Sequence, residues 1–214
     1  MLRYLKKRMA TIEFNHLIVD ESDLYFFKDF EGGKYCITFY LERKNVYSVE
    51  LRIYFDIVDE ILKKFNNKLR NLKIGEQEEY SETLRIPVVW FELDFITDTY
   101  RNKPLDTVVL LKDDSSIDWF IQLYDYEIEE FFRHYSNLEH ARESLTNPLS
   151  LYVKHAPHWN SILLKLFFAK RTSNQEYQDQ IMKSDMEYEK AGSGVHLNLP
   201  VEVYESYKEE LASM

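Results

Sequence analysis

The sequence has few of the residues that break or cross-link a polypeptide. Its 214 residues include five glycines, five prolines and a single cysteine, Cys36. So few breakers do not fit a disordered or low-complexity chain, and one cysteine excludes an internal disulfide. Disulfide-free chains are typical of reducing compartments, so we predict a cytoplasmic protein in which Cys36 is a buried thiol within a strand.

Long apolar runs are also absent. The longest one, residues 162–169, is interrupted by Lys165 and falls far short of the roughly 20 apolar residues that a membrane-spanning helix needs. Four basic residues lie within residues 1–9, but no apolar core of a signal peptide follows them. We therefore expect neither a membrane segment nor secretion through a signal peptide.

Positive charge is in deficit. The chain has 27 lysines and arginines against 37 aspartates and glutamates, and its formal net charge is -10. The average field of such a protein repels phosphate backbones and anionic lipid headgroups, so nucleic acid and membranes are poor candidates for partners. A basic protein is the class of partner that this charge favours.

Aromatic residues are abundant, with 16 tyrosines and 14 phenylalanines. In the first half of the chain, apolar and aromatic residues alternate with polar ones over short runs, which is typical of strands. The predicted strands are Thr11–Val19, Lys34–Glu42, Val46–Phe55, Leu84–Ile96 and Leu105–Leu111, the second and third of them joined as a hairpin.

In Val58–Leu72, and again in the chain beyond Ser115, apolar residues recur every three or four positions, which predicts helices. Residues 117–124 fit a helix and a strand equally. The predicted fold class is α+β, with a mainly antiparallel sheet from the N-terminal half packed against helices of the C-terminal half. We assign residues 1–171 to a single domain, 172–194 to an exposed helix or linker, and 195–214 to a short strand and a C-terminal helix docked on that domain.

The most distinctive pattern is a run of acidic residues without any base between Asp113 and Phe132, with aromatic residues among them. Carboxylates attract a basic partner and speed its encounter, while aromatic rings supply desolvated contact area. A solvated helix face whose rings lie in the core is the alternative interpretation. The residues that we predict to bind a partner are Asp113, Asp114, Asp118, Trp119, Asp125, Tyr126, Glu129 and Glu130.

A second segment, Ser144–Gln175, contains no acidic residue but several basic ones, including Lys165. It could bind an anion or neutralise the acidic region of its own fold, and a mostly apolar helix with a few bases is also ordinary core structure. His155 and His158 in this segment have no third ligand at a suitable spacing. We therefore predict no metal site and no cofactor.

Three residues resemble the site of restriction-type nucleases. Asp29, Glu42 and Lys44 match the acid and the Glu-x-Lys arrangement of that family, although Lys28 stands where the family has a proline. The resemblance implies magnesium-dependent cleavage of phosphodiester bonds.

Residues 195–204 resemble the strand and the first-helix start of ribbon-helix-helix repressors. In that family the strand pairs with its twin in a dimer and reads bases, which implies His196 and Asn198 as the matching positions. The strand of this chain has no arginine or lysine.

Charge and aromatic patterning together predict a protein-binding module, specifically an immunity protein or antitoxin that masks a basic, nucleic-acid-directed toxin. Two alternatives stay open. A metal-dependent phosphodiesterase or nuclease would have a dispersed acidic site that a single sequence does not reveal. A structural or assembly subunit, including a homo-oligomer, would use the apolar helix Trp159–Phe168 as its interface.

Overall fold

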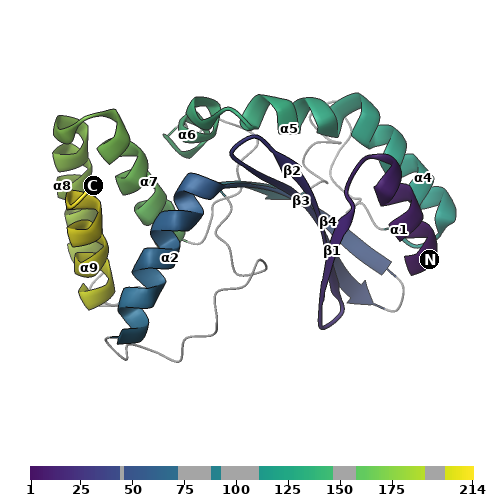
Figure 1. The fold of residues 1–214 in the computed structure, drawn as a ribbon, viewed down its shortest axis with the longest axis horizontal. Coiled ribbons are helices and arrows are strands. Elements are labelled where there is room, and N and C mark those ends of the chain that lie inside the picture. The colour runs from purple at the N-terminus through teal and green to yellow at the C-terminus, as the bar shows by residue number, and fades with distance from the viewer. Residues whose placement is uncertain (44–45, 72–87, 93–110, 147–157, 191–200) are drawn as a thin grey trace.

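The computed structural model describes residues 1–43, 46–71, 88–92, 111–146, 158–190 and 201–214. It has the α+β architecture predicted from the sequence, with an antiparallel sheet in the N-terminal half and helices in the C-terminal half (Figure 1). In chain order the elements are α1 (Leu2–Thr11), β1 (His16–Asp20), β2 (Asp23–Phe30), β3 (Gly33–Arg43), β4 (Val46–Phe55), α2 (Asp56–Asn71), β5 (Val89–Glu92), α4 (Asp114–Leu123), η2 (Tyr124–Ile128), α5 (Glu129–Tyr135), α6 (Leu138–Thr146), α7 (His158–Thr172), α8 (Asn174–Lys190) and α9 (Val201–Ala212).

The five strands form one antiparallel sheet in the order β1-β2-β3-β4-β5. The longest pairing joins β3 and β4, from Gly33 opposite Phe55 to Arg43 opposite Val46. Gly33 must be a glycine, because a Cβ atom at this position would overlap the carbonyl oxygen of Tyr54. The sequence therefore sets the close approach of these two strands through one residue that has no side chain.

Both faces of the sheet are largely buried along β2, β3 and β4, and successive residues of each strand contribute to opposite faces. Helices α1, α4 and α5 cover the first face (Figure 1). Phe39 contacts Phe120 of α4 with ring centroids 5.6 Å apart, and Tyr35 stacks on Phe132 of α5 at 4.6 Å. The main core thus lies between the sheet and these helices.

The second face of the sheet contains a network of polar and aromatic side chains around Arg52. Its Nη2 donates to Glu50 Oε2 at 2.8 Å and to the Tyr40 hydroxyl, and the side chains of Arg52 and Glu50 are only 13% and 12% exposed. Burial alone lowers the pKa of Arg52, but the phenol oxygens of Tyr54 and Tyr40 and the carboxylate of Glu50 outweigh it, so this pKa is raised. Arg52 therefore stays charged inside the fold. The apolar neighbours on this face are Tyr25, Phe27, Cys36 and Tyr54.

Three helices at the other end of the molecule are held together by tyrosine hydroxyls. Tyr207 on α9 donates to the carbonyl oxygen of Leu163 on α7 at 3.1 Å. Tyr204 donates to Asp185 Oδ1 on α8 at 2.9 Å, and Lys208 donates to the same oxygen at 3.1 Å. The apolar side chains of α7 are buried within this chain, namely Ile162, Leu163, Leu164, Leu166, Phe167 and Phe168.

Two sequence-based assignments are wrong in the N-terminal region. The predicted strand Thr11–Val19 is helical at its start, because α1 ends at Thr11 and β1 begins only at His16. β2 is not among the predicted strands. Its four buried residues, 24–27, are consecutive rather than alternating, as a strand covered on both faces requires.

The remaining predicted elements have mixed outcomes. The ambiguous residues 117–124 are helical in α4 and the start of η2. β5 lies inside the predicted strand Leu84–Ile96, and Leu111 forms an isolated bridge to Tyr47. Residues 105–110 of the predicted strand Leu105–Leu111 and the start of the segment 195–214, with its predicted short strand, lie outside the described residues. In the described parts of the chain, no helix combines the length and the apolar character needed to cross a membrane.

Candidate functional site

The acidic run lies on a single helical rod that is formed by α4, η2 and α5 without a break in helical backbone angles. The rod crosses the first face of the sheet (Figure 1), and its buried apolar residues belong to the main core. The predicted partner-binding residues therefore share one element, but their environments differ along it.

The first acid of the run, Asp113, has a structural role as the N-cap of α4. Its Oδ1 accepts a hydrogen bond from the backbone N–H of Ser116 at 2.8 Å, and the Ser116 hydroxyl accepts one from the Asp113 N–H at 3.0 Å. These hydrogen bonds, first from the backbone of Ser116 and then from its side chain, lower the pKa of the Asp113 carboxyl. The capping box thus uses the carboxylate that the sequence pattern assigned to a partner. Asp114, the next residue, is exposed in the first turn.

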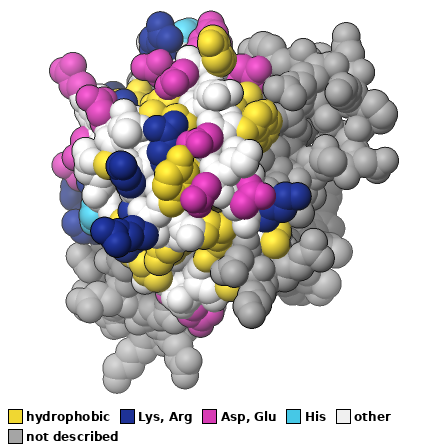
Figure 2. All heavy atoms as spheres, turned by 90° about the vertical axis from the view of Figure 1, so that its right-hand side faces the viewer, with side chains coloured by type: hydrophobic (Ala, Val, Ile, Leu, Met, Phe, Trp, Pro, Cys, Tyr) yellow, Lys and Arg dark blue, Asp and Glu magenta, His cyan; other side chains and the backbone are white. Residues whose placement is uncertain are grey.

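Asp118 is paired within the chain. Its Oδ1 accepts a hydrogen bond from the Tyr4 hydroxyl at 2.7 Å and lies 2.8 Å from Nε of Arg8, both on α1. The hydrogen bond to Asp118 raises the pKa of Tyr4. Figure 2 shows acidic and basic side chains intermingled on the side of the molecule that carries α1 and α4. The basic N-terminal helix therefore neutralises this part of the acidic run.

Trp119 is half-buried and packs against the main core. Its ring therefore belongs largely to the interior, as the alternative interpretation of the sequence proposed for the aromatic residues. Tyr124 is likewise buried, at 3% exposure.

The rod widens into a π-helical turn at η2, where the N–H of Glu129 bonds to the carbonyl oxygen of Tyr124. A π-turn inserts one extra residue into a helix, and such turns are frequent at functional sites. Here Tyr124 and Ile128 remain buried, while Asp125 and Tyr126 are exposed on the outer side. Tyr126 is 81% exposed, more than any other large hydrophobic residue among those described.

Asp125, Tyr126, Glu129 and Glu130 together form what we call the acidic ridge. All four are exposed, and residues three or four positions apart on a helix are surface neighbours. Arg133 follows Glu129 by four residues, a spacing that allows an ion pair. No ion pair or hydrogen bond of the three carboxylates forms among the described residues. The ridge therefore presents three carboxylates without a partner in the described parts of the chain, next to one exposed aromatic ring.

Asp114 lies eleven residues before Asp125, which corresponds to about 16 Å along a helix. The structure thus separates the eight predicted residues into a ridge of four, two that are used inside the fold, a half-buried tryptophan and one distant exposed acid. The contacts of Asp118 with α1 were missed because Tyr4 is 114 positions away in the sequence.

The two acids of the nuclease resemblance do not come together. Asp29 lies opposite Lys34 near the start of β3, and its carboxylate pairs with Lys34 at 2.9 Å. Glu42 follows Lys34 by eight residues along β3, which corresponds to about 27 Å at the rise of a strand. Lys44 lies outside the described residues.

Metal-binding side chains do not cluster in the described parts of the chain, where no three His, Cys, Asp or Glu residues lie close enough to hold an ion. Of the two histidines considered above, His155 lies outside the described residues and His158 begins α7. Cys36 is fully buried in β3, as predicted. His196 and Asn198 lie outside the described residues.

No protein-family model matches the chain, and no curated protein or solved structure is significantly similar to it.

Proposed function

We propose that the protein binds a basic protein partner through the acidic ridge. The observation that carries this proposal is the position of Tyr126, which is 81% exposed on a π-turn and is surrounded by carboxylates that have no cation partner among the described residues. An exposed ring with unpaired charge around it has the composition of an interface centre with a polar rim.

The charges of the ridge favour a cationic partner in particular. The chain as a whole carries a net charge of -10, so its long-range field has the same sign as the ridge and speeds the approach of a basic surface. Arg8 of α1 does not cancel this local charge, since it already pairs with Asp118, and Arg133 forms no ion pair with the ridge among the described residues. Complementary charge of this kind acts mainly on the association rate and on specificity.

The partner class that we propose is a toxin directed at nucleic acid. Such a protein needs a positive cleft to hold phosphate backbones. An acidic protein that covers this cleft would act as an immunity protein or antitoxin, with charge giving fast encounter and the Tyr126 ring giving slow release. The exposed ridge, rather than a concave site with catalytic groups, is the feature that supports binding over catalysis.

The large apolar side chains of α7 that the structure describes, from Ile162 to Phe168, are buried against this chain's own core and so offer no exposed interface for an assembly subunit. A ridge of charged side chains is also a poor surface for a symmetric dimer, since identical ridges would repel each other. The proposal therefore names a different, basic protein as the partner.

The test begins with purification at low ionic strength from the cells that make the protein, followed by identification of the co-eluting protein and its isoelectric point. The affinity of the purified pair is then measured for the wild type and for the triple variant Asp125→Lys, Glu129→Lys and Glu130→Lys. We expect the triple variant to bind about ten- to a hundredfold more weakly at low salt, with a smaller difference at high salt.

A matched control carries the same charge change elsewhere. Glu31, Glu60 and Glu202 are exposed acids on other parts of the structure, and their reversal to lysine should slow association only slightly. Tyr126→Ala should raise the dissociation rate about tenfold while leaving the salt dependence unchanged. Equal affinities for the ridge variant and the control variant would refute the proposal, and so would an acidic partner.

A further inference from the structure

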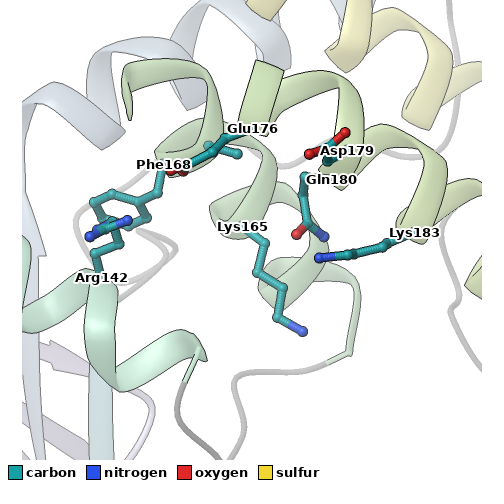
Figure 3. Close-up of a pocket in the computed structure, with 8 residues that line it drawn as sticks. Arg142, Lys165, Phe168, Glu176, Asp179, Gln180 and Lys183 are labelled. Atoms are coloured by element: carbon teal, nitrogen blue, oxygen red, sulfur yellow. The ribbon is translucent and has the colours of Figure 1, made fainter. Parts of the chain in front are cut away.

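A hollow of about 230 Å³ lies between α6, α7 and α8 (Figure 3). The buried ring of Phe168 lies at one side of it, next to Arg142 (Figure 3). The side chains around it come from all three helices. They are Arg142, Lys165, Phe168, Ala169, Glu176, Asp179, Gln180 and Lys183.

Each of the three helices contributes one cation to this hollow. Arg142 on α6 is partly neutralised, because its Nε lies 2.8 Å from Glu139 Oε2 on the same helix. Lys165 on α7 and Lys183 on α8 form no ion pair or hydrogen bond among the described residues. Figure 3 shows both lysine side chains directed into the same space, beside the side-chain amide of Gln180.

The acids on the same face of α8 do not neutralise these lysines. Asp179 precedes Lys183 by four residues, the spacing and order that favour an ion pair on a helix. Its Oδ1 instead accepts a hydrogen bond from Gln175 Nε2 at 3.0 Å, and Figure 3 shows its carboxylate directed away from the two lysines. Glu176 is exposed and makes no ion pair among the described residues.

Other bases of the acid-free segment have partners of a different kind. Lys170 donates to Asn174 Oδ1 at 3.2 Å and lies 5.2 Å from the ring centroid of Tyr177. Arg171 lies over the ring of Phe167 at 5.9 Å. Lys165 is thus the one base of the described part of this segment that has no partner there, and it faces the hollow.

Two ammonium groups that share a space without a counter-ion among the described residues repel each other. An anion between them would remove this cost and add charge-assisted hydrogen bonds. A phosphate group fits best, because its several oxygens can accept from both ammonium groups at once, whereas the amide nitrogen of Gln180 already donates to Ser184 Oγ at 3.2 Å. The hollow of about 230 Å³ is several times the roughly 30 Å³ that one water molecule occupies in the liquid, so it has room for a group of several non-hydrogen atoms such as a phosphate.

We propose that the hollow between α6, α7 and α8 binds the phosphate group of a small molecule through Lys165 and Lys183. Arg142 and Phe168 form the side of the hollow that accommodates the rest of that molecule. This site lies on helices other than the acidic ridge, and it is independent of the proposed function.

The test is a calorimetric titration of the full chain, in low-salt buffer without phosphate, with inorganic phosphate, pyrophosphate, adenosine 5′-monophosphate and adenosine. We expect the three phosphate-bearing ligands to bind and adenosine not to bind. Lys165→Gln and Lys183→Gln should each weaken binding about tenfold, and the double variant should abolish it. Lys64→Gln on α2 is the control, since Lys64 is exposed and lies outside the hollow.

The ligands also distinguish free phosphate from a phosphorylated compound. Equal affinities for phosphate and adenosine monophosphate would assign the site to the phosphate alone, whereas tighter binding of the nucleotide would place its base beside Arg142 and Phe168; both results support the proposal. Absence of binding by all three phosphate-bearing ligands, or binding that the double variant retains, would overturn it.

A second measurement serves if the double variant does not fold. Lys183→Glu places an acid opposite Lys165, and we expect a higher urea midpoint in low salt that disappears in high salt. No salt-dependent gain would mean that the two lysines do not face one space, which would also overturn the proposal.

Discussion

The ion pair between Arg52 and Glu50 connects two neighbouring side chains on the second face of the sheet, and its removal gives the sharpest test of the fold. Both side chains are nearly covered, with 13% and 12% of their surfaces exposed. Arg52 also donates to the Tyr40 hydroxyl, and its guanidinium lies 5.6 Å from the centroid of that ring. A single substitution of Glu50 therefore leaves a cation inside the protein with only neutral partners.

Breaking a fully buried pair by removing one partner costs about 3–5 kcal/mol of unfolding free energy. Because some solvent still reaches this pair and Tyr40 remains as a partner, we expect Glu50→Ala to cost about 2–3 kcal/mol. The double variant Glu50→Leu with Arg52→Met should cost less than the two single changes together, since no buried charge then remains unpaired. Asp29→Ala breaks the pair with Lys34, in which Asp29 is 80% exposed, and should cost at most about 1 kcal/mol.

Urea denaturation followed by circular dichroism measures these free energies, and the two single and the double variants form a thermodynamic cycle. We expect a coupling between positions 50 and 52 of about 1.5 kcal/mol or more. If Glu50→Ala costs no more than Asp29→Ala and the cycle shows no coupling, the pair behaves as a solvated surface pair and the burial reasoning is wrong.

Three further predictions concern backbone contacts, a buried hydroxyl and a helix cap. Gly33→Ala should lower stability by about 2 kcal/mol or more in urea denaturation, because the added Cβ overlaps the Tyr54 carbonyl oxygen in a closely paired strand; a cost below that of an average surface substitution would contradict this. Tyr207→Phe should cost about 1–2 kcal/mol by the same measurement, since the carbonyl of Leu163 loses its buried donor, and a neutral result would show that water replaces the hydroxyl. Asp113→Asn should destabilise the protein at neutral pH, and this cost should shrink as the pH falls. A carboxyl with a lowered pKa stabilises the fold above its unfolded-state pKa and loses this effect as the pH falls through its folded-state pKa. A difference in stability that does not shrink in acid would contradict the capping role.

The strands of the central hairpin and the first long helix after it could be predicted from the sequence, because their patterns are local. Alternation of Tyr35, Ile37 and Phe39 with Cys36 and Thr38 identified β3 and assigned its residues to opposite faces. This alternation follows directly from the pleat of a strand, in which successive side chains point to opposite faces. β2 escaped prediction for the opposite reason, since burial on both faces leaves no alternation to detect.

The candidate site shows a similar division. The sequence by itself determined where the acidic residues concentrate and that most of them share one helical rod, since charge order and apolar spacing are properties of neighbouring residues. Only the tertiary structure decided that Asp118 is neutralised by α1, that Tyr126 points to solvent, and that Lys165 and Lys183 meet at one hollow. The physical reason is that Coulomb energy and burial depend on distances through space, and these are set by how helices and strands pack rather than by the number of residues between two charges.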